Sequence, residues 1–259
     1  PIHLNGLFEG DHSPELRYEH FMPPPSPVFR NPTDIFEVIR DQDVLLHHPY
    51  ESFDCVIQLL EQAAADPKVL AIKQTLYRTG SDPRIASALM QAAQNGKQVA
   101  VVMELKARFD EASNIRWARE LEEAGVHVSY GLLGYKVHCK LCVVVREEED
   151  GLRRYLHLAT GNYNPTTAAL YTDFGLLTCR PDFGEDAASV FNLLTGFCEF
   201  EGAHKLIVAP FDFRSRMLEL IHRETEHAEA GRPARIAAKM NSLVDRLVIE
   251  ALFSASQAG

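Results

Sequence analysis

The sequence contains no apolar run long enough to cross a lipid bilayer, and its N-terminal segment does not resemble a signal peptide. A membrane-spanning helix needs about 18–20 consecutive apolar residues, and no stretch approaches that length. The opening segment, PIHLNGLFEGDHSPELRYEH, has neither a basic start nor an apolar core of signal-peptide length. The sequence therefore gives no indication of a membrane-spanning or secreted protein.

Cysteine is scarce, and its distribution argues against a disulfide framework. The five cysteines, at positions 55, 139, 142, 179 and 198, are odd in number and lie in apolar segments. This pattern suits buried thiols in a reducing compartment. Cys139 and Cys142 spell C-x-x-C, but on a strand their thiols point to opposite faces, and no second pair would complete a zinc site. We therefore do not expect zinc here.

Basic charge and the common phosphate-binding motifs are also lacking. The 26 Lys and Arg residues are outnumbered by 36 Asp and Glu, which gives a net charge of −10. Such a balance argues against a general nucleic-acid or anionic-membrane surface. The sequence has no G-x-x-x-x-G-K-[ST], no G-x-G-x-x-G after a strand and no G-x-S-x-G. Neither a P-loop nor a dinucleotide fingerprint is therefore available, and a hydrolase with a nucleophile elbow is disfavoured.

What the sequence does contain is an alternation of strands and helices. Apolar runs predict strands at 69–77, 98–105 and 126–130, and helical spacing with caps predicts helices at 53–67, 81–96 and 111–125. This order predicts an α/β fold with a mixed, largely parallel sheet flanked by helices. Beyond it, helical patterns at roughly 185–200, 212–230 and 235–256 predict a helical C-terminal extension. The proline-rich residues 1–32 read as an arm or linker.

The segment GYKVHCKLCVVV, residues 134–145, reads as a strand with two cations in it. Alternation places His138 and Lys140 on one face with Cys142, while the other face is wholly apolar. From the pattern alone, a half-exposed strand with a polar start is also possible. Asp150-Gly151 predicts a hairpin turn after this strand, with residues 155–159 pairing antiparallel to it.

Cationic residues follow the predicted strands where ligands bind in open α/β sheets, beyond the carboxyl ends. Arg78 follows the first strand, and Lys106 and Arg108 follow the second. An antiparallel neighbour would bring the start of the strand with His138 and Lys140 to the same edge. Converging arginines suit phosphate oxygens, and a neutral histidine can attack phosphorus. Each arginine taken alone also fits a solvated charge at a strand end.

Two further segments contain residues of possible chemical interest. TGNYNPTTAALYTD, residues 160–173, suits a turn whose backbone donates to a phosphate, and equally an ordinary turn before a short helix. His47 and His48 precede Pro49, and we interpret them as a cap and a surface residue at a helix entrance.

Six segments together resemble bacterial polyphosphate kinases of the first type, from about residue 30 to the end. They are LLHHPYESF, AIKQTLYRTG, AAQNGKQVAVVMELKARFDE, GYKVHCKL, HLATGNYNPTTAALYTDFGLLT and AAKMNSLVD. That family has phospholipase D-like catalytic domains, and HCK resembles the start of the H-x-K-x-x-x-x-D motif. The aspartate of that motif is Val145 here, a departure that fits the kinases rather than the diesterases.

The resemblance implies a role for individual residues. His138 would take the terminal phosphate of ATP as a phosphohistidine and pass it reversibly to polyphosphate, while Lys140 would neutralise the transferring group. Arg78 and Arg108 match the family's magnesium–phosphate site. Because a guanidinium cannot ligate Mg²⁺, we interpret both as clamps on the phosphates that adjoin the metal.

The same resemblance assigns substrate-binding residues and partners. Tyr171 matches a position that contacts ATP, Lys106 would bind the phosphates, and Asn162 would orient the site. The implied partners are ATP or ADP, inorganic polyphosphate, Mg²⁺, the remaining domains of a longer chain and further copies of the enzyme, with no nucleic acid. The implied location is the cytoplasm, with a peripheral association with the inner membrane left open.

The resemblance also predicts the domain organisation. Residues 1–32 would form the arm, 33–210 the catalytic domain and 211–259 the helical start of a second catalytic domain. A fragment of this kind would be weak or inactive alone. A phospholipase D-like phosphodiesterase and a non-catalytic polyphosphate-binding module remain open as alternatives.

Overall fold

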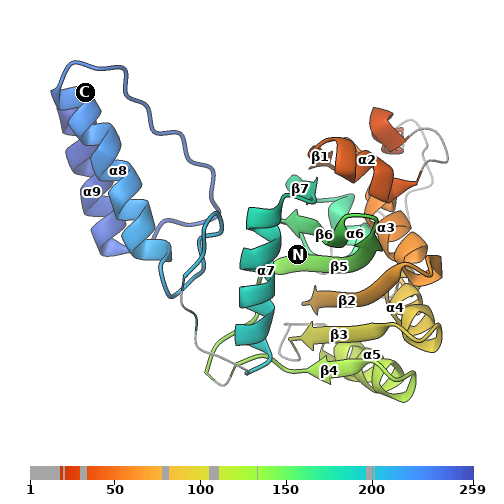
Figure 1. The fold of residues 1–259 in the computed structure, drawn as a ribbon. Helices are drawn as coiled ribbons and strands as arrows, with labels where there is room; N and C mark the ends of the chain where they lie inside the picture. The colour runs from red at the N-terminus through yellow and green to blue at the C-terminus, as the bar shows by residue number, and fades with distance from the viewer. Residues whose placement is uncertain are drawn as a thin grey trace.

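The computed structural model describes residues 18–19, 21–29, 34–77, 82–104, 111–132, 134–196, 200 and 202–259. Most of the predicted arm lies outside these residues, as do Arg78, Lys106, Arg108 and Cys198. Within the described residues the fold is a mixed sheet with helices on both faces (Figure 1). The predicted α/β class is therefore confirmed.

The strands form one seven-stranded sheet in the order β1-β7-β6-β5-β2-β3-β4 among the described residues. They are β1 (Val44–His48), β2 (Val69–Leu76), β3 (Gln98–Met103), β4 (His127–Ser129), β5 (Lys140–Glu148), β6 (Gly151–Ala159) and β7 (Asp173–Thr178). Only the β2–β3 and β3–β4 pairs are parallel, whereas the other four pairs are antiparallel. The predicted predominance of parallel pairs is therefore wrong. Helical crossovers connect only the first part of the sheet, and β5 to β7 follow one another through shorter links.

The described helices are α2 (Ile35–Asp41), α3 (Asp54–Ala65), α4 (Arg84–Gln94), α5 (Glu111–Glu123), α6 (Pro165–Ala168), α7 (Pro181–Leu194), α8 (Phe213–Glu229) and α9 (Arg246–Ala258), with a 3-10 turn at Pro27–Phe29. Helices α2 to α5 cover one face of the sheet and α7 covers the other (Figure 1). Helices α8 and α9 pack against each other beyond α7. No helix in the described part of the chain is long and apolar enough to cross a membrane.

Strand β5 begins later than predicted. It starts at Lys140, so His138 lies in the segment before the strand rather than within it. The hydroxyl of Thr75 on β2 donates to the carbonyl of Cys139 at 2.9 Å and accepts from the N–H of Leu141 at 2.9 Å. Where β5 enters the sheet, the hydroxyl of Thr75 thus takes the place of backbone hydrogen bonds between β2 and β5. From there the predicted alternation is confirmed, since Cys142 packs toward α2–α5 and Leu141 toward α7.

The predicted helix at 235–256 is wrong in its first half. Residues 232–245 are not helical, and α9 begins at Arg246. The carboxylate of Asp245 accepts from the N–H groups of Leu247 and Val248, which makes it the N-cap of a new helix. The predicted helix at 185–200 also shifts, because Pro181 provides an earlier first turn.

Candidate functional site

The predicted meeting of strand ends is confirmed within the described residues. Because β5 runs antiparallel to β2, its first residue, Lys140, lies at the edge where β2 and β3 end. Lys140 pairs with Ala159 at the end of β6, and Ala159 pairs with Gly175 near the start of β7. We call this the catalytic edge, because the residues predicted from the sequence to be catalytic lie there. Arg78, Lys106 and Arg108 follow the ends of β2 and β3 in the sequence, but they lie outside the described residues.

His138 and Lys140 lie together at this edge around the ring of Tyr77. The imidazole of His138 is exposed, and its ring meets that of Tyr77 edge to face, with centroids 4.8 Å apart. Lys140 is buried, its Nζ lies 5.2 Å from the Tyr77 ring centroid, and it donates to the carbonyl of His138. An accessible imidazole thus has a buried ammonium group beside its own backbone.

A buried hydrogen-bonded cluster ties these strand ends together. The Nδ2 of Asn114 on α5 donates to the carbonyl of Tyr77 at 2.9 Å and to that of Glu104 at 2.8 Å. The N–H of Glu104 donates to the carbonyl of Leu76 at 3.0 Å, and its Oε2 accepts from the N–H of Val137 at 3.2 Å. The ends of β2 and β3 and the segment before His138 are therefore held in one arrangement. Nothing in the sequence pattern singled out Asn114 or Glu104.

A cavity of about 460 Å³ opens beside His138. His138, Lys140 and Ala159 line it from the sheet, and α7 and the segment before α8 supply its apolar wall. The apolar residues of that wall include Val190, Leu193, Leu194, Leu206, Val208, Pro210, Phe211 and Phe213. An apolar wall excludes water and strengthens electrostatic interactions at the polar side. Sequence reasoning missed this wall because its residues come from distant parts of the chain.

The predicted turn at 160–164 follows β6 at the catalytic edge. Asn164 caps α6, since its Oδ1 accepts from the N–H groups of Thr166 and Thr167. The Oδ1 of Asn162 is buried and has no hydrogen-bond partner among the described residues. Tyr171 is exposed after α6, just before β7 begins at this edge. Asn162 and Tyr171 thus lie near the same edge of the sheet as His138.

His48 is not at a helix entrance, and the interpretation of it as a surface residue is wrong. His47 and His48 end strand β1, and His48 is buried, with its Nδ1–H donating to the carbonyl of Glu51 at 2.8 Å. The Nε2 atoms of His48 and of buried His157 on β6 both face Gly175. A Cβ on Gly175 would lie 2.7 Å from the Nε2 of His157. Glycine therefore makes room for two imidazoles behind the catalytic edge.

His157 is held as a neutral side chain. Its Nδ1 lies 3.0 Å from the hydroxyl of Tyr163, which donates to the carbonyl of His157 at 3.2 Å, so we assign the Nδ1 proton as the donor. Burial, together with the nearby His48, lowers the pKa of His157 to about 3. His157 thus supports the turn that carries Asn162 rather than meeting a soluble substrate.

The described residues do not form a magnesium site by themselves. No group of three or more His, Cys, Asp or Glu side chains among them could hold a metal ion. Mg²⁺ in phosphoryl-transfer sites is bound by oxygen ligands, often with substrate phosphates among them. The expectation of magnesium therefore depends on Arg78 and Arg108 and on phosphates that they would hold.

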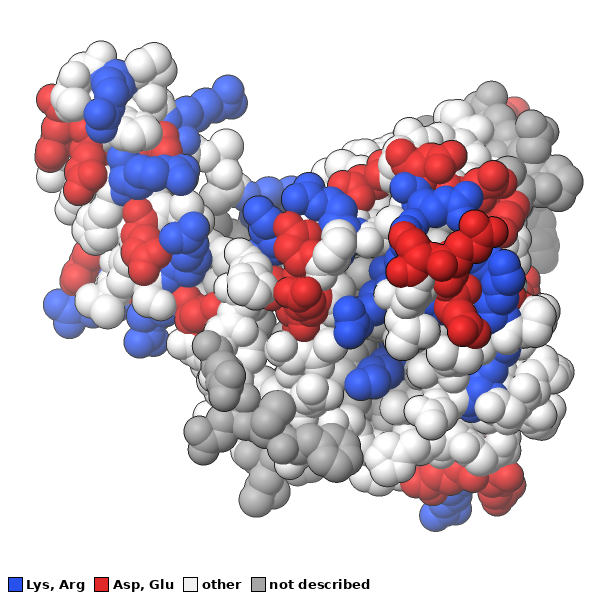
Figure 2. All heavy atoms as spheres, viewed as in Figure 1, with Lys and Arg blue, Asp and Glu red and all other residues white. Residues whose placement is uncertain are grey.

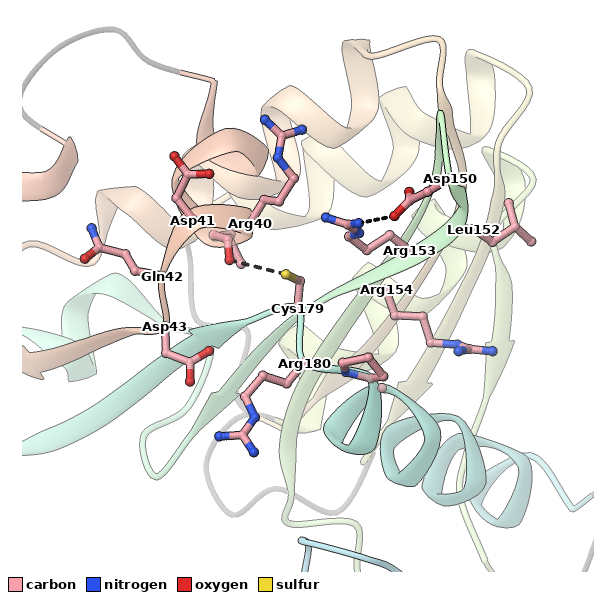
Figure 3. Close-up of a pocket in the computed structure, with 13 residues that line it drawn as sticks. Arg40, Asp41, Gln42, Asp43, Asp150, Leu152, Arg153, Arg154, Cys179 and Arg180 are labelled. Carbon is pink, nitrogen blue, oxygen red and sulfur yellow. Dashed lines mark hydrogen bonds and ion pairs between the residues drawn. The ribbon is translucent and has the colours of Figure 1, made fainter.

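A second cavity, of about 530 Å³, lies at the opposite edge of the sheet (Figure 3). Arg40, Arg153, Arg154 and Arg180 line it together with Asp41, Asp43 and Asp150. Arg153 pairs with Asp150 at 2.6 Å, and Arg180 with Asp182 at 3.2 Å. Acidic and basic side chains are likewise interspersed over the face seen in Figure 2. Arg40, Arg153 and Arg180 thus each have a carboxylate partner, and no predicted site residue lines this cavity.

Comparisons with known proteins agree with the resemblance seen in the sequence. The family described as "Polyphosphate kinase C-terminal domain 1" matches residues 34–200, and "Polyphosphate kinase C-terminal domain 2" matches residues 206–259. A polyphosphate kinase of Streptomyces coelicolor is 53% identical over 271 residues, which cover 100% of this chain and 36% of that protein. One from Synechocystis is 58% identical over 227 residues, covering 87% of this chain and 31% of that protein.

The similarity extends to structure. The crystal structure of polyphosphate kinase from Porphyromonas gingivalis superposes with a TM-score of 0.86 at 36% identity, covering 100% of this chain and 44% of that one. The chain spans about a third of the length of the curated relatives it matches. Since the first family covers residues 34–200, well over half of the sequence, the chain belongs to the polyphosphate kinase family.

Proposed function

We propose that this chain supplies the phosphohistidine half of a polyphosphate kinase, which transfers the terminal phosphate of ATP reversibly to inorganic polyphosphate. The observation that supports it best is the arrangement at the catalytic edge. His138 presents an exposed imidazole beside the buried ammonium of Lys140, where the β2 and β3 ends lead toward Arg78, Lys106 and Arg108.

The first step is an attack of His138 on ATP. A lone pair of the neutral imidazole forms the N–P bond to the γ-phosphorus, the P–O bond to the β-phosphate breaks, and its electrons leave with ADP. Phosphoryl transfer depends mostly on positioning and charge neutralisation. Lys140 supplies positive charge next to His138, and the apolar wall of the cavity keeps water from screening it.

The second step returns the histidine to its starting state. A terminal oxygen of polyphosphate attacks the phosphorus, the N–P bond breaks, and its electrons return to the imidazole. Splitting the transfer in this way lets one site serve donor and acceptor in turn. Each step is reversible, because the lengthened polyphosphate can return its terminal phosphoryl group to His138, from which ADP can take it to re-form ATP.

The remaining predicted residues belong to this proposal in supporting roles. Arg78, Arg108 and Lys106 would hold phosphate oxygens, and Mg²⁺ would accompany the ATP phosphates rather than bind a protein cluster. Tyr171, which is exposed at the same edge, would contact ATP. The Oδ1 of Asn162, which has no partner in the part of the chain that the structure describes, would orient a donor group in the site.

The chain would act as part of a longer enzyme. Residues 33–210 form the catalytic domain in this proposal, and residues 211–259 begin a second one that completes the site. We expect the 259-residue chain alone to be weak or inactive in polyphosphate synthesis, and the full-length enzyme to be a homo-oligomer.

Labelling with γ-³²P-ATP and Mg²⁺ tests the proposal. In an enzyme that contains this chain, acid-labile and base-stable label is expected on the wild type and absent from His138→Ala. Label that persists in His138→Ala would contradict the assignment of His138. Release of product from a phosphodiester would favour a phosphodiesterase, and salt-dependent polyphosphate binding by a protein that never takes label would favour a binding module.

A further inference from the structure

The ring of Tyr77 contacts the two groups that the proposed reaction needs. It meets the exposed imidazole of His138 edge to face, with centroids 4.8 Å apart and ring planes at 77°. It also lies under the ammonium of Lys140, whose Nζ is 5.2 Å from the ring centroid. Both distances are in the range of favourable aromatic and cation–π contacts. The half-buried ring of Tyr77 thus contacts the side chains of both His138 and Lys140.

Tyr77 is itself fixed by the fold. It follows the last residue of β2, and the Nδ2 of fully buried Asn114 donates to its carbonyl at 2.9 Å. The same Asn114 nitrogen holds the carbonyl of Glu104, and Glu104 holds the N–H of Val137, next to His138. The backbone on both sides of the ring–imidazole contact is therefore anchored to one buried cluster.

We propose that Tyr77 is a positioning residue that restrains the imidazole of His138 and the ammonium of Lys140 for phosphoryl transfer. The effect on phosphoryl transfer rests on the proposed function, whereas the restraint of the His138 imidazole by the ring does not. An exposed histidine retains its side-chain rotamers unless a neighbour restricts them. The ring supplies that neighbour on the side where Lys140 also lies, so the nucleophile and the charge keep one relative arrangement.

The ring, rather than the hydroxyl, carries this role. Tyr77→Phe keeps both ring contacts and should behave like the wild type. Tyr77→Leu removes them, and Tyr77→Met does the same with an unbranched side chain of similar volume. Tyr130→Leu is the control, because it removes an exposed tyrosine ring just after β4, a strand that β3 separates from β2. The hydroxyl of Tyr130 donates to Glu122.

Two measurements on the purified chain test the proposal. NMR relaxation of ¹³C,¹⁵N-labelled histidine, assigned with His138→Ala, reports the order of the His138 imidazole. Phosphoramidate, a small phosphoryl donor that needs no nucleotide site, reports how fast His138 accepts a phosphoryl group. In Tyr77→Leu and Tyr77→Met we expect the imidazole of His138 to average among rotamers. We also expect its phosphorylation to slow about three- to tenfold, which corresponds to the cost of immobilising one side chain.

The outcomes separate this inference from the proposed function. Loss of order and rate in the Leu and Met variants, with both retained in Tyr77→Phe and Tyr130→Leu, supports the positioning role. Wild-type order and rate in a folded Leu or Met variant would overturn it. If a longer enzyme that contains this chain never takes label at His138, the proposed function loses its nucleophile, while the order measurements still decide whether Tyr77 restrains the ring.

Discussion

At the scale of single residues, two histidines near the catalytic edge have opposite surroundings. His138 is exposed beside the cavity and borders a buried lysine. His157 is fully buried, hydrogen-bonded to Tyr163, and its pKa is lowered to about 3. A soluble polyanion can reach only the first of these imidazoles. The proposed chemistry is therefore assigned to His138, whereas His157 packs behind the turn that carries Asn162.

The lowered pKa of His157 predicts a dependence of stability on pH. An unfolded histidine has a pKa of about 6.5. Between about pH 6.5 and pH 3 the unfolded chain therefore binds a proton that folded His157 does not. The contribution is fully present above pH 6.5 and is lost as the pH falls through this window, with a slope of up to about 1.4 kcal/mol per pH unit.

His157→Gln removes this titration and should flatten the fall in the free energy of unfolding between pH 6.5 and pH 4, measured by urea unfolding. His222→Gln is the matched control, because that imidazole lies on the exposed surface of α8 and is solvated in both states. An unchanged slope in His157→Gln would show that another group causes the acid sensitivity.

At the scale of elements, the entry of β5 into the sheet depends on one hydroxyl. Thr75 is buried, and its Oγ1 bonds both the carbonyl of Cys139 and the N–H of Leu141. Thr75→Val keeps the shape but leaves both backbone groups without this partner. We expect a loss of about 1–3 kcal/mol in the free energy of unfolding, measured in urea.

Thr225→Val provides the comparison for this experiment. Its hydroxyl donates to the carbonyl of Ile221 within α8, where the helix supplies that carbonyl with its own backbone bonding. We expect a change within about 0.5 kcal/mol there. If Thr75→Val were as mild as Thr225→Val, the hydroxyl would not hold the start of β5.

The elements that the sequence predicts well are those with local signals. Helices α3, α4 and α5 and strands β2 and β3 lie close to the predicted positions, because apolar spacing and flanking Gly or Pro mark them. Strand β1 contains two histidines before a proline, so its pattern resembled a helix entrance. Residues 232–245 have helix-forming composition, but Asp245 caps a separate helix instead.

In the candidate site, too, the features with local sequence signals were predictable and the others were not. The position of His138 and Lys140 at one edge with the β2 end was predictable from strand order and the antiparallel hairpin. The contacts that hold them were not, because Tyr77, Asn114 and Val137 are distant in sequence and meet only through the fold. Hydrogen bonds from a buried asparagine to two strand-end carbonyls leave no periodic pattern in a sequence.

At the scale of the whole molecule, a net charge of −10 would coexist with the proposed cationic site for polyanions. Charged groups at the far edge of the sheet pair among themselves, as buried Arg146 does with Asp66 and Glu148. Burial opposes ionisation of Glu148, but hydrogen bonds from Tyr155 and Arg146 outweigh it and hold its pKa below the usual value. Positive charge for phosphate would thus be concentrated at the catalytic edge.

The most direct test of the account locates the phosphoryl group and follows its transfer. An enzyme containing this chain is labelled with γ-³²P-ATP, the peptide with residues 134–145 is mapped by tandem mass spectrometry, and the labelled enzyme is then mixed with polyphosphate. The account predicts the phosphoryl group on His138 and its rapid loss to the polyphosphate. A phosphoryl group on another residue, or one on His138 that polyphosphate cannot remove, would contradict it.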